Sequence, residues 1–504
     1  MDFINNFPFF SIMLCMFCAI VTFVLNGRYA RHLTRIVLGL VIVMSLALLI
    51  KLHISGESFV YFMGHFPAPW GNEIRAGELE AILALFVSVI AFFAVLGGLN
   101  AILEDVEEDK QNLYFILVDM MVASLLAMIY TNDLFTAYVF IEINTIAGCG
   151  LIMIRQLGKS IVTAVRYMVI SLVGSGLFLI GVTLLYTITG HLLMSNIQES
   201  VAEIASHESY RTTLTVIIAL MSVGLAIKSG LFPFHSWIPE AYGTSNACSS
   251  ALLSSVVSKG YIFLLIKIYY RVIGIDVVRS SSVLNILYVF GVTAIILGSV
   301  LAIREKNIRK MIAYSSVAQI GYIYMGIGIG TTIGFVAAIF HIFAHGCTKA
   351  LLFISSTEFT EGSHAKRYDE LYGFGHKYKL SALCFSVGAF SMVGFPLLAG
   401  FISKVWFAKA GIASDGKMLA TLIALALSTL LNCVYFLRAV VILYSENKRS
   451  ESTGEPYLSQ SVQERPARIQ YFIAIVSLVV LNFVLGLAAG PIMNVIEKGL
   501  DIFN

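Results

Sequence analysis

The chain has 504 residues, of which 58% are hydrophobic and only 12% carry a charge. A soluble globular chain carries roughly 25% charged residues, so this composition excludes that class. The formal net charge of +3 is too small to indicate a nucleic-acid partner. Together with a mean hydropathy of +0.86, these values predict an all-α polytopic membrane protein.

Apolar runs near 20 residues long divide the chain and predict about fourteen transmembrane helices. The spans are expected near residues 4–25, 34–53, 78–101, 112–130, 132–154, 165–189, 212–232, 246–270, 281–303, 309–329, 332–357, 380–404, 417–443 and 469–493. The first run is interpreted as a retained span and not as a signal peptide, because it lacks a basic leader and a small-residue cleavage site.

Basic residues in the connections between spans predict the orientation. Most of them lie on the odd-numbered connections, beginning with Arg28, Arg31 and Arg35 after the first span. Because basic connections stay in the cytoplasm, we expect a multi-pass protein of the cell (inner) membrane with both termini outside. Residues 190–211 predict a short amphipathic helix on the outer face, and residues 444–468 form the longest polar cytoplasmic loop.

All seven cysteines lie inside apolar runs and are interpreted as core residues. Cys15 and Cys18 form a CMFC pattern, but no second pair follows at metal-binding spacing. The glycine-rich stretch at 326–334 follows no strand, as a nucleotide fingerprint requires. We therefore expect neither a metal nor a cofactor, and the chain shows no catalytic constellation.

The stretch GLAIKSGLFPFHSWIPEAYG, at residues 224–243, places a lysine inside an apolar run and a proline five residues later. A charge in the middle of a hydrophobic segment costs about 2.5–3.5 kcal/mol on insertion scales. Pro233 breaks the helix, which is tolerated where the freed backbone faces protein or a wet cavity. Lys228 and this break predict an ion path. A second break is expected at Pro396, followed by Lys404.

Glu142 lies about nine residues inside its span, roughly 14 Å deep and near the bilayer midplane. We expect a protonatable carboxylate that faces Lys228, the alternative being a helix–helix staple with a fixed cation. Lys259, in the middle of the next span, is expected to receive the proton from Lys228. Lys267 lies nearer the span end and is interpreted as an interfacial anchor.

His341, His345 and Lys349 are spaced four residues apart, which places them on one helix face and predicts a proton relay that ends at Lys404. Weaker candidates are Asp119, Arg166 and Tyr314. The two broken spans, one in each half, favour an inverted-repeat transporter with sites at the midplane.

Four segments resemble the antiporter-like subunits of respiratory complex I, of Mrp-type Na⁺/H⁺ antiporters and of membrane-bound hydrogenases. They are KSGLFPFHSWIPEAY (228–242), IRKMIAYSSVAQIGYI (308–323), HIFAHGCTKALLF (341–353) and GFPLLAGFISK (394–404). Within the family, YTITGHLLMSNI (186–197) is most similar to the Mrp D subunit type. The chain departs from the family pattern at Ser229, where many relatives have leucine, and at SNACSS (245–250), where relatives have a proline-rich stretch.

The resemblance implies fourteen helices with two inverted five-helix repeats, each with a broken helix. The implied segments are an N-terminal three-helix part (1–111), a first antiporter repeat (112–272), a second antiporter repeat (280–445), and a cytoplasmic loop with a C-terminal helix (446–504). It implies translocation of H⁺, alone or with Na⁺. The residues it implies are a Glu–Lys pair (Glu142, Lys228), a central axis (Lys259, His341, His345, Lys349) and an exit residue (Lys404).

The implied partners are other membrane subunits of the same complex, the lipid bilayer and the transported ions. Three alternatives stay open at this point. The chain could be a redox-linked pump subunit of a hydrogenase or complex I-like assembly instead of part of a free-standing Mrp antiporter. It could also be a stand-alone secondary transporter, or a structural module that conducts no ion.

Overall fold

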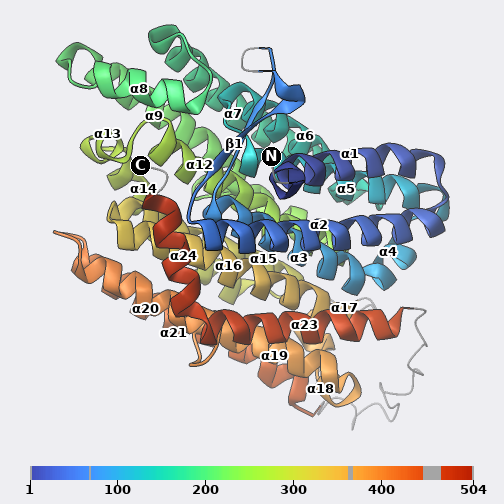
Figure 1. Ribbon diagram of the computed structural model, residues 1–504. Coiled ribbons are helices and arrows are strands. Elements are labelled where there is room, and N and C mark those ends of the chain that lie inside the picture. Colours follow the sequence, from blue (N-terminus) through green and yellow to red (C-terminus); the bar gives the residue numbers. More distant parts are fainter. Residues whose placement is uncertain (1–2, 67–69, 361–366, 447–466, 502–504) are drawn as a thin grey trace.

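The computed structural model describes residues 3–66, 70–360, 367–446 and 467–501 (Figure 1). The first third contains η1 (Phe3–Asn6), α1 (Phe7–Val24), α2 (Gly27–Ser55), β1 (Phe59–Phe62), η2 (Met63–His65), β2 (Glu73–Ala76), α3 (Glu78–Gly97), α4 (Leu99–Asp105), η3 (Glu108–Lys110), α5 (Gln111–Tyr130) and α6 (Leu134–Met153). The middle contains α7 (Gly158–Thr189), α8 (Met194–Ile204), α9 (Glu208–Ser229), η4 (Phe234–Ser236), α10 (Trp237–Thr244), α11 (Ala247–Leu252), the π-helical turn η5 (Leu253–Val257), α12 (Ser258–Arg271) and α13 (Ile275–Ser280).

The last part contains α14 (Val283–Arg304), α15 (Ile308–Ile329), α16 (Thr332–Ser355), α17 (Thr357–Thr360), η6 (Tyr368–Glu370), α18 (Phe374–Lys377), α19 (Lys379–Val393), α20 (Ala399–Ile412), α21 (Met418–Tyr444), α23 (Arg468–Leu487) and α24 (Ala489–Asp501). Thirteen helical segments in the described ranges are long and apolar enough to cross a membrane. The split pair α19 and α20 occupies the place of the predicted span at 380–404. The predicted polytopic helical fold is therefore confirmed, with one short β-hairpin added.

Two helices are interrupted at the predicted prolines. α9 ends at Ser229 and the chain turns through Gly230, whose φ is +80°. α19 ends at Val393 and turns through Gly394, whose φ is +100°. Glycine reaches these left-handed values without the steric cost that a Cβ would impose. Each break leaves a helix end inside the bundle. The free backbone carbonyl groups at that end need a hydrogen-bond donor from elsewhere in the protein.

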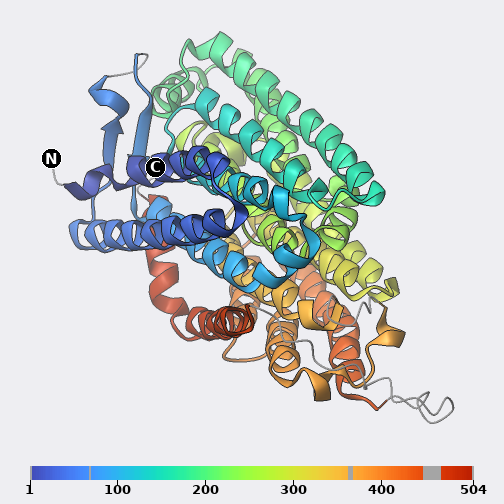
Figure 2. The same ribbon diagram turned by 90° about the vertical axis from the view of Figure 1, so that its right-hand side faces the viewer.

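Three helical segments are the most deeply buried. The apolar stretches of segments 247–271 and 332–360 are completely buried, and that of 308–329 is 94% buried. Figure 1 shows α12, α15 and α16 enclosed by the other helices, and Figure 2 shows the blue and green half of the chain above the orange and red half. Because the enclosing helices separate these segments from lipid, charged side chains are tolerated on α12 and α16.

The bundle has two ends, which we name by their connections. The hairpin face carries β1 and β2, which pair antiparallel with Phe59 opposite Ala76. It also carries α8, joined to the start of α6 by the bridge between Asp133 and Leu193. α8 lies within the stretch for which an amphipathic helix was predicted. The opposite face carries α4, η3, η6 and α18, whereas most of the predicted polar loop at 444–468 lies outside the described residues.

The C-terminal span is shorter than predicted. α23 ends at Leu487 and the chain turns into α24, which Figure 1 shows running across the bundle end and not along it. Its Gly499 lies so close to Leu79 at the start of α3 that an added Cβ would come within 2.6 Å of the Leu79 Cβ. α24 is thus packed along the hairpin face.

Candidate functional site

The structure brings Glu142 of α6 and Lys228 of α9 together inside the bundle. The Lys228 Nζ lies 3.7 Å from Glu142 Oε1, and the lysine side chain is only 1% exposed. It also donates a hydrogen bond of 2.5 Å to the hydroxyl of Thr145, one turn further along α6. The ring of Tyr261 lies 5.8 Å from the same ammonium. Two oxygens and a π-face therefore surround one buried cation.

Lys228 occupies the last turn of α9, just before the break at Gly230. The carboxyl end of a helix carries a partial negative charge, so a cation is favoured there. Lys404 lies at the equivalent place of the second break: its ammonium donates 2.5 Å to the carbonyl oxygen of Val393, the last residue of α19, and 3.1 Å to Thr429 Oγ1. Each broken helix therefore holds a lysine ammonium at its interrupted end.

Lys259 lies directly after a π-helical turn. Its ammonium donates to the Ser254 carbonyl oxygen within that turn and, at 3.0 Å, to the Ser258 hydroxyl. The Ser254 hydroxyl lies 3.1 Å from that of Ser316 on α15. π turns occur mostly as single turns inside α-helices, often at functional sites, and this one presents a backbone carbonyl to a buried lysine.

The three titratable residues of α16 lie on one face, as their spacing predicted. His341 Nδ1 lies 2.5 Å from the Ser403 hydroxyl of α20. The rings of His341 and His345 are stacked, with centroids 5.8 Å apart and an interplanar angle of 9°. Lys349 donates 2.8 Å to the Ile312 carbonyl oxygen and also bonds the Ser315 hydroxyl.

The charges of neighbouring lysines link these residues into a row. Lys259 lies within electrostatic range of both His345 and Lys349. His341 lies within range of Lys259 and Lys404. Neither ring nitrogen of His345 has a hydrogen-bond partner among the described residues. A buried imidazole without protein partners is a natural place for bound water, which a proton relay requires.

The weaker candidates do not join this row. Asp119 accepts hydrogen bonds from Cys18 (3.0 Å) and Thr34 (2.9 Å), where α1, α2 and α5 meet. Arg166 is exposed on α7, and Tyr314 is partly buried on α15 one turn after Lys310. Asp119 therefore ties α5 to the first two helices of the chain.

The interpretation of Lys267 as an interfacial anchor is wrong. Its side chain is fully buried and donates 2.7 Å to the carbonyl oxygens of both Ile129 and Thr131. Glu80, at the start of α3, lies 3.9 Å away. Hydropathy places Lys267 near a span end but cannot show that α3 and α5 cover it. The feature of the sequence that could have indicated a buried partner for Lys267 was the carboxylate of Glu80, within the predicted span at 78–101.

Sequence reasoning also missed the hydroxyl partners of the lysines and histidines, namely Thr145, Ser315, Ser403 and Thr429. Serine and threonine are common in membrane helices, where they bond their own backbone, so nothing in the sequence distinguishes these four.

Comparison with known proteins places this geometry in a family. Residues 131–452 match the family described as "NADH:quinone oxidoreductase/Mrp antiporter, TM". NADH-quinone oxidoreductase subunit N of Desulforudis audaxviator is 31% identical, over 89% of this chain and 88% of that protein. The D-type chain of the Na⁺/H⁺ antiporter of Alkalihalophilus pseudofirmus is 26% identical, over 92% of this chain and 91% of that protein. A chain of the Mrp complex from Dietzia sp. DQ12-45-1b has the same fold, with a TM-score of 0.85 at 22% identity, over 99% of this chain and 97% of that one. The chain therefore belongs to the NADH:quinone oxidoreductase/Mrp antiporter transmembrane family, as an antiporter-like subunit.

Proposed function

We propose that this chain translocates protons, alone or in exchange for Na⁺, as the antiporter-like subunit of a multisubunit membrane complex. The observation that carries the proposal is the ion pair between Glu142 and Lys228, 3.7 Å apart, beside a broken helix. Burying the Lys228 ammonium costs several kcal/mol of desolvation, which a purely structural contact could avoid with apolar residues.

The pair can act as a proton gate. Burial favours the neutral amine of Lys228, whereas the Glu142 carboxylate and the Thr145 hydroxyl favour the ammonium. When Glu142 is protonated or moves away, the ammonium loses its main support and releases a proton. When Glu142 returns as a carboxylate, Lys228 takes up a proton again.

The released proton has a row of acceptors. Lys259 is the next buried lysine, and Tyr261, two residues further on α12, touches Lys228. Neutral imidazoles accept a proton on one ring nitrogen and release it from the other, so His345 and His341 suit transfer along α16. Lys349 and Lys404 are the further members of the proposed axis, with Lys404 as its exit at the second break.

The two breaks support an arrangement of two related halves, the first at 112–272 and the second at 280–445. Each half contains one broken helix and one lysine at its interrupted end. Under this proposal the partners are other membrane subunits; the neighbour from Dietzia is named as part of a complex. Residues 1–111 and 446–504 then flank the two halves.

We further propose that the chain lies in the cell (inner) membrane with the hairpin face and both termini on the outer side, away from the cytoplasm. The basic residues gathered on the opposite face support this orientation. Single cysteines introduced at exposed Lys159 and exposed His207 test it with a membrane-impermeant maleimide. Labelling of His207→Cys but not Lys159→Cys in intact cells is expected, and the reverse pattern would overturn the orientation.

The ion-transport proposal is tested in membrane vesicles that carry the whole complex. Glu142→Gln keeps the side-chain shape and removes the titratable charge, and transport is expected to fall by about a hundredfold. Glu199→Gln, an exposed carboxylate on α8, is the matched control and should transport at the wild-type rate. Wild-type transport by Glu142→Gln in an assembled complex would make the pair a staple and favour the structural-module alternative.

One second candidate is favoured by a specific observation. The relative from Desulforudis is named for an oxidoreductase, so the assembly around this chain could be redox-linked. Iron–sulfur absorbance in the purified complex would support that version, and its absence would favour a free-standing antiporter. Transport by the chain expressed alone would instead support the stand-alone transporter.

A further inference from the structure

A second group of buried charges lies near the hairpin face, apart from the row described above. The carboxylate of Glu80 on α3 is 3.9 Å from the Lys267 ammonium and 3.7 Å from Arg271 Nη1, both on α12. The three side chains are 0–2% exposed. We call these residues the α12 cluster. Glu80 also accepts a hydrogen bond of 3.1 Å from the Gly77 amide.

The charge of the α12 cluster is not balanced internally, since two cations share one carboxylate. Glu73 and Arg75 of β2 are the further charged groups within electrostatic range of Arg271, and Arg75 also acts on Lys267. Ionisable residues inside membrane segments are rare and mark ion or proton paths more often than scaffolding. We therefore expect the cluster to have a function beyond joining α3 to α12.

The cluster continues a stripe that begins at Lys259. Residues 259, 263, 267 and 271 follow one another at intervals of four, so Lys259, Phe263, Lys267 and Arg271 lie along one face of α12. The rise from Lys259 to Lys267 is about 12 Å. The stripe leads from the centre of the bundle to the hairpin face, with Phe263 as its apolar interruption.

The cluster is linked to a polar cavity through Lys267, which donates to the carbonyl oxygen of Thr131, the residue before Asn132. Glu73 accepts a 2.5 Å hydrogen bond from the Asn132 amide and lines a cavity of about 530 Å³ on the hairpin face. Asn72, Asp133 and His191 line the same cavity. Polar side chains of this kind bind water, so a proton that reached Glu73 would have a path to solvent.

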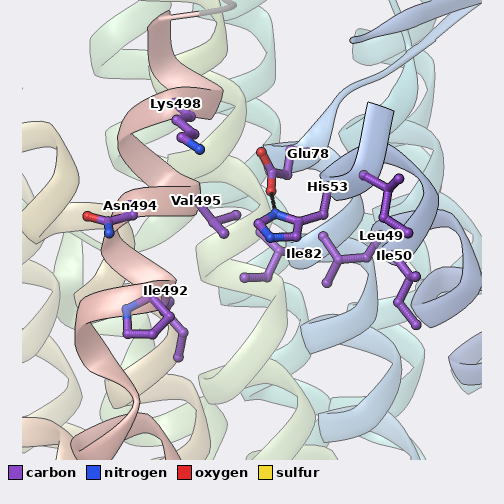
Figure 3. A pocket seen from close by; sticks show the side chains of 11 residues that line it. Leu49, Ile50, His53, Glu78, Ile82, Ile492, Asn494, Val495 and Lys498 are labelled. Atoms are coloured by element: carbon purple, nitrogen blue, oxygen red, sulfur yellow. Dashed lines mark hydrogen bonds and ion pairs between the residues drawn. The ribbon is translucent and has the colours of Figure 1, made fainter. Parts of the chain in front are cut away.

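Another cavity near this face, of about 510 Å³, lies between α2, α3 and α24 (Figure 3). Its walls are mainly aliphatic, including Leu49, Ile82 and Val495, and the bond between His53 and Glu78 lies at its edge. An aliphatic cavity does not stabilise a chain of water molecules. Of these two cavities, the polar one at Glu73 is the better mouth for a proton path from the α12 cluster.

We infer that the α12 cluster is a proton outlet from Lys259 to the hairpin face, beside the route along α16 to Lys404. This inference rests on the proposed function. Lys267 gives a proton to Glu80: an N–H bond breaks, an O–H bond forms, and both groups become neutral. Glu80 then passes the proton through water to the Glu73 carboxylate, which releases it to water at the mouth, and the Lys267 amine takes a proton from the Lys259 ammonium through water. Arg271 keeps its charge throughout, and this fixed positive charge favours the carboxylate form of Glu80 after the proton has left.

The experiment compares charge-matched variants of the whole complex in vesicles, with H⁺ movement followed by a pH-sensitive dye. Glu80→Gln alone leaves two buried cations without their carboxylate, so it is measured together with the double variant Glu80→Gln/Lys267→Gln, which keeps the net charge. The double variant is expected to assemble as wild type and to transport at least about threefold more slowly, because one of the two proposed outlets is lost.

The matched control is the partly buried ion pair of Arg155 and Asp105, 2.7 Å apart on the opposite face. The double variant Asp105→Asn/Arg155→Gln also removes one charge of each sign and should keep transport within about twofold of wild type. If the double variant of the α12 cluster assembles and transports at the wild-type rate, the cluster is a staple and the outlet is wrong.

Failure of the outlet and failure of the proposed function give different results. Lys228→Ala is measured in the same vesicles. Lost transport in Lys228→Ala with normal transport in Glu80→Gln/Lys267→Gln overturns only the outlet. Normal transport in both overturns ion translocation by this chain, and the outlet with it.

Discussion

The ammonium of Lys404 lies 2.5 Å from the carbonyl oxygen of Val393, so the second half of a broken helix caps the end of the first half. A helix end inside a membrane has carbonyl groups that water cannot reach, and a donor brought by α20 satisfies one of them. The lysine thereby holds the break in place while presenting a transferable proton. Under the proposed mechanism, structural support and proton transfer would fall on the same atom.

Lys404→Met is therefore expected to lower both stability and transport. An unsatisfied buried carbonyl costs about 1–3 kcal/mol, and the proton-carrying group is gone. Lys404→Arg keeps the cap but releases its proton far less readily, so it should keep stability and lose transport. Thermal unfolding of the purified complex and vesicle transport measure the two effects. Lys409→Met, an exposed lysine on the same helix, should change neither.

Thr145→Val tests the hydroxyl that shares Lys228 with Glu142. Hydrogen bonds to charged groups contribute about 1.5–3 kcal/mol, so without this one the Lys228 ammonium forms less readily. Half-maximal transport should then require about tenfold more H⁺, which moves the pH profile towards acid. Thr145→Ser keeps the hydroxyl and should keep the wild-type profile. A profile unchanged in Thr145→Val would mean that the 2.5 Å contact has no part in proton uptake.

His345→Phe should separate relay from scaffold. Both ring nitrogens of His345 lack a hydrogen-bond partner within the described residues, so the imidazole contributes little to the fold. Phenylalanine has a similar shape and removes two polar atoms, so thermal stability should stay equal or rise. Transport should fall by about a hundredfold, since no proton can be relayed. His207→Phe, at an exposed position, is the control. Parallel loss of stability and transport would contradict the relay.

Gly346→Ala should disturb the π-helical turn before Lys259. A Cβ at Gly346 would lie 2.7 Å from the Ser255 carbonyl oxygen and 2.6 Å from Phe86 Cζ, closer than real contacts allow. Overpacking of this kind costs about 1–3 kcal/mol, more than the roughly 1 kcal/mol that alanine gains in helix propensity. The melting temperature and transport should both fall. Gly176→Ala on α7 meets open space and should be neutral or slightly stabilising.

The sequence was most informative about features that depend only on the order of residues along each membrane span. Span length, proline breaks and the four-residue spacing of His341, His345 and Lys349 are all readable along the chain, and the structure follows them. The contact between Glu142 and Lys228 was expected from the similar depth of two opposite charges and from the family resemblance, and the structure places the two groups 3.7 Å apart.

What the sequence could not show depends on lateral packing or on backbone detail. Lys267 has the pattern of an interfacial anchor, and only the placement of Glu80 and the end of α5 turns it into a buried cation. The π turn at Leu253–Val257 contains neither glycine nor proline, so nothing distinguishes its sequence from a regular helix. The donor for the Val393 carbonyl oxygen depends on how α20 folds back, which hydropathy does not describe.

The course of α24 has a mechanical consequence. This helix lies across the bundle end and contacts both α3, which carries Glu80, and α16, which carries His341. A rigid helix that touches both cannot follow a displacement of one without pressing on the other. If α16 slides during transport, α24 would pass that movement to the start of α3, and the two proposed exits would then move together.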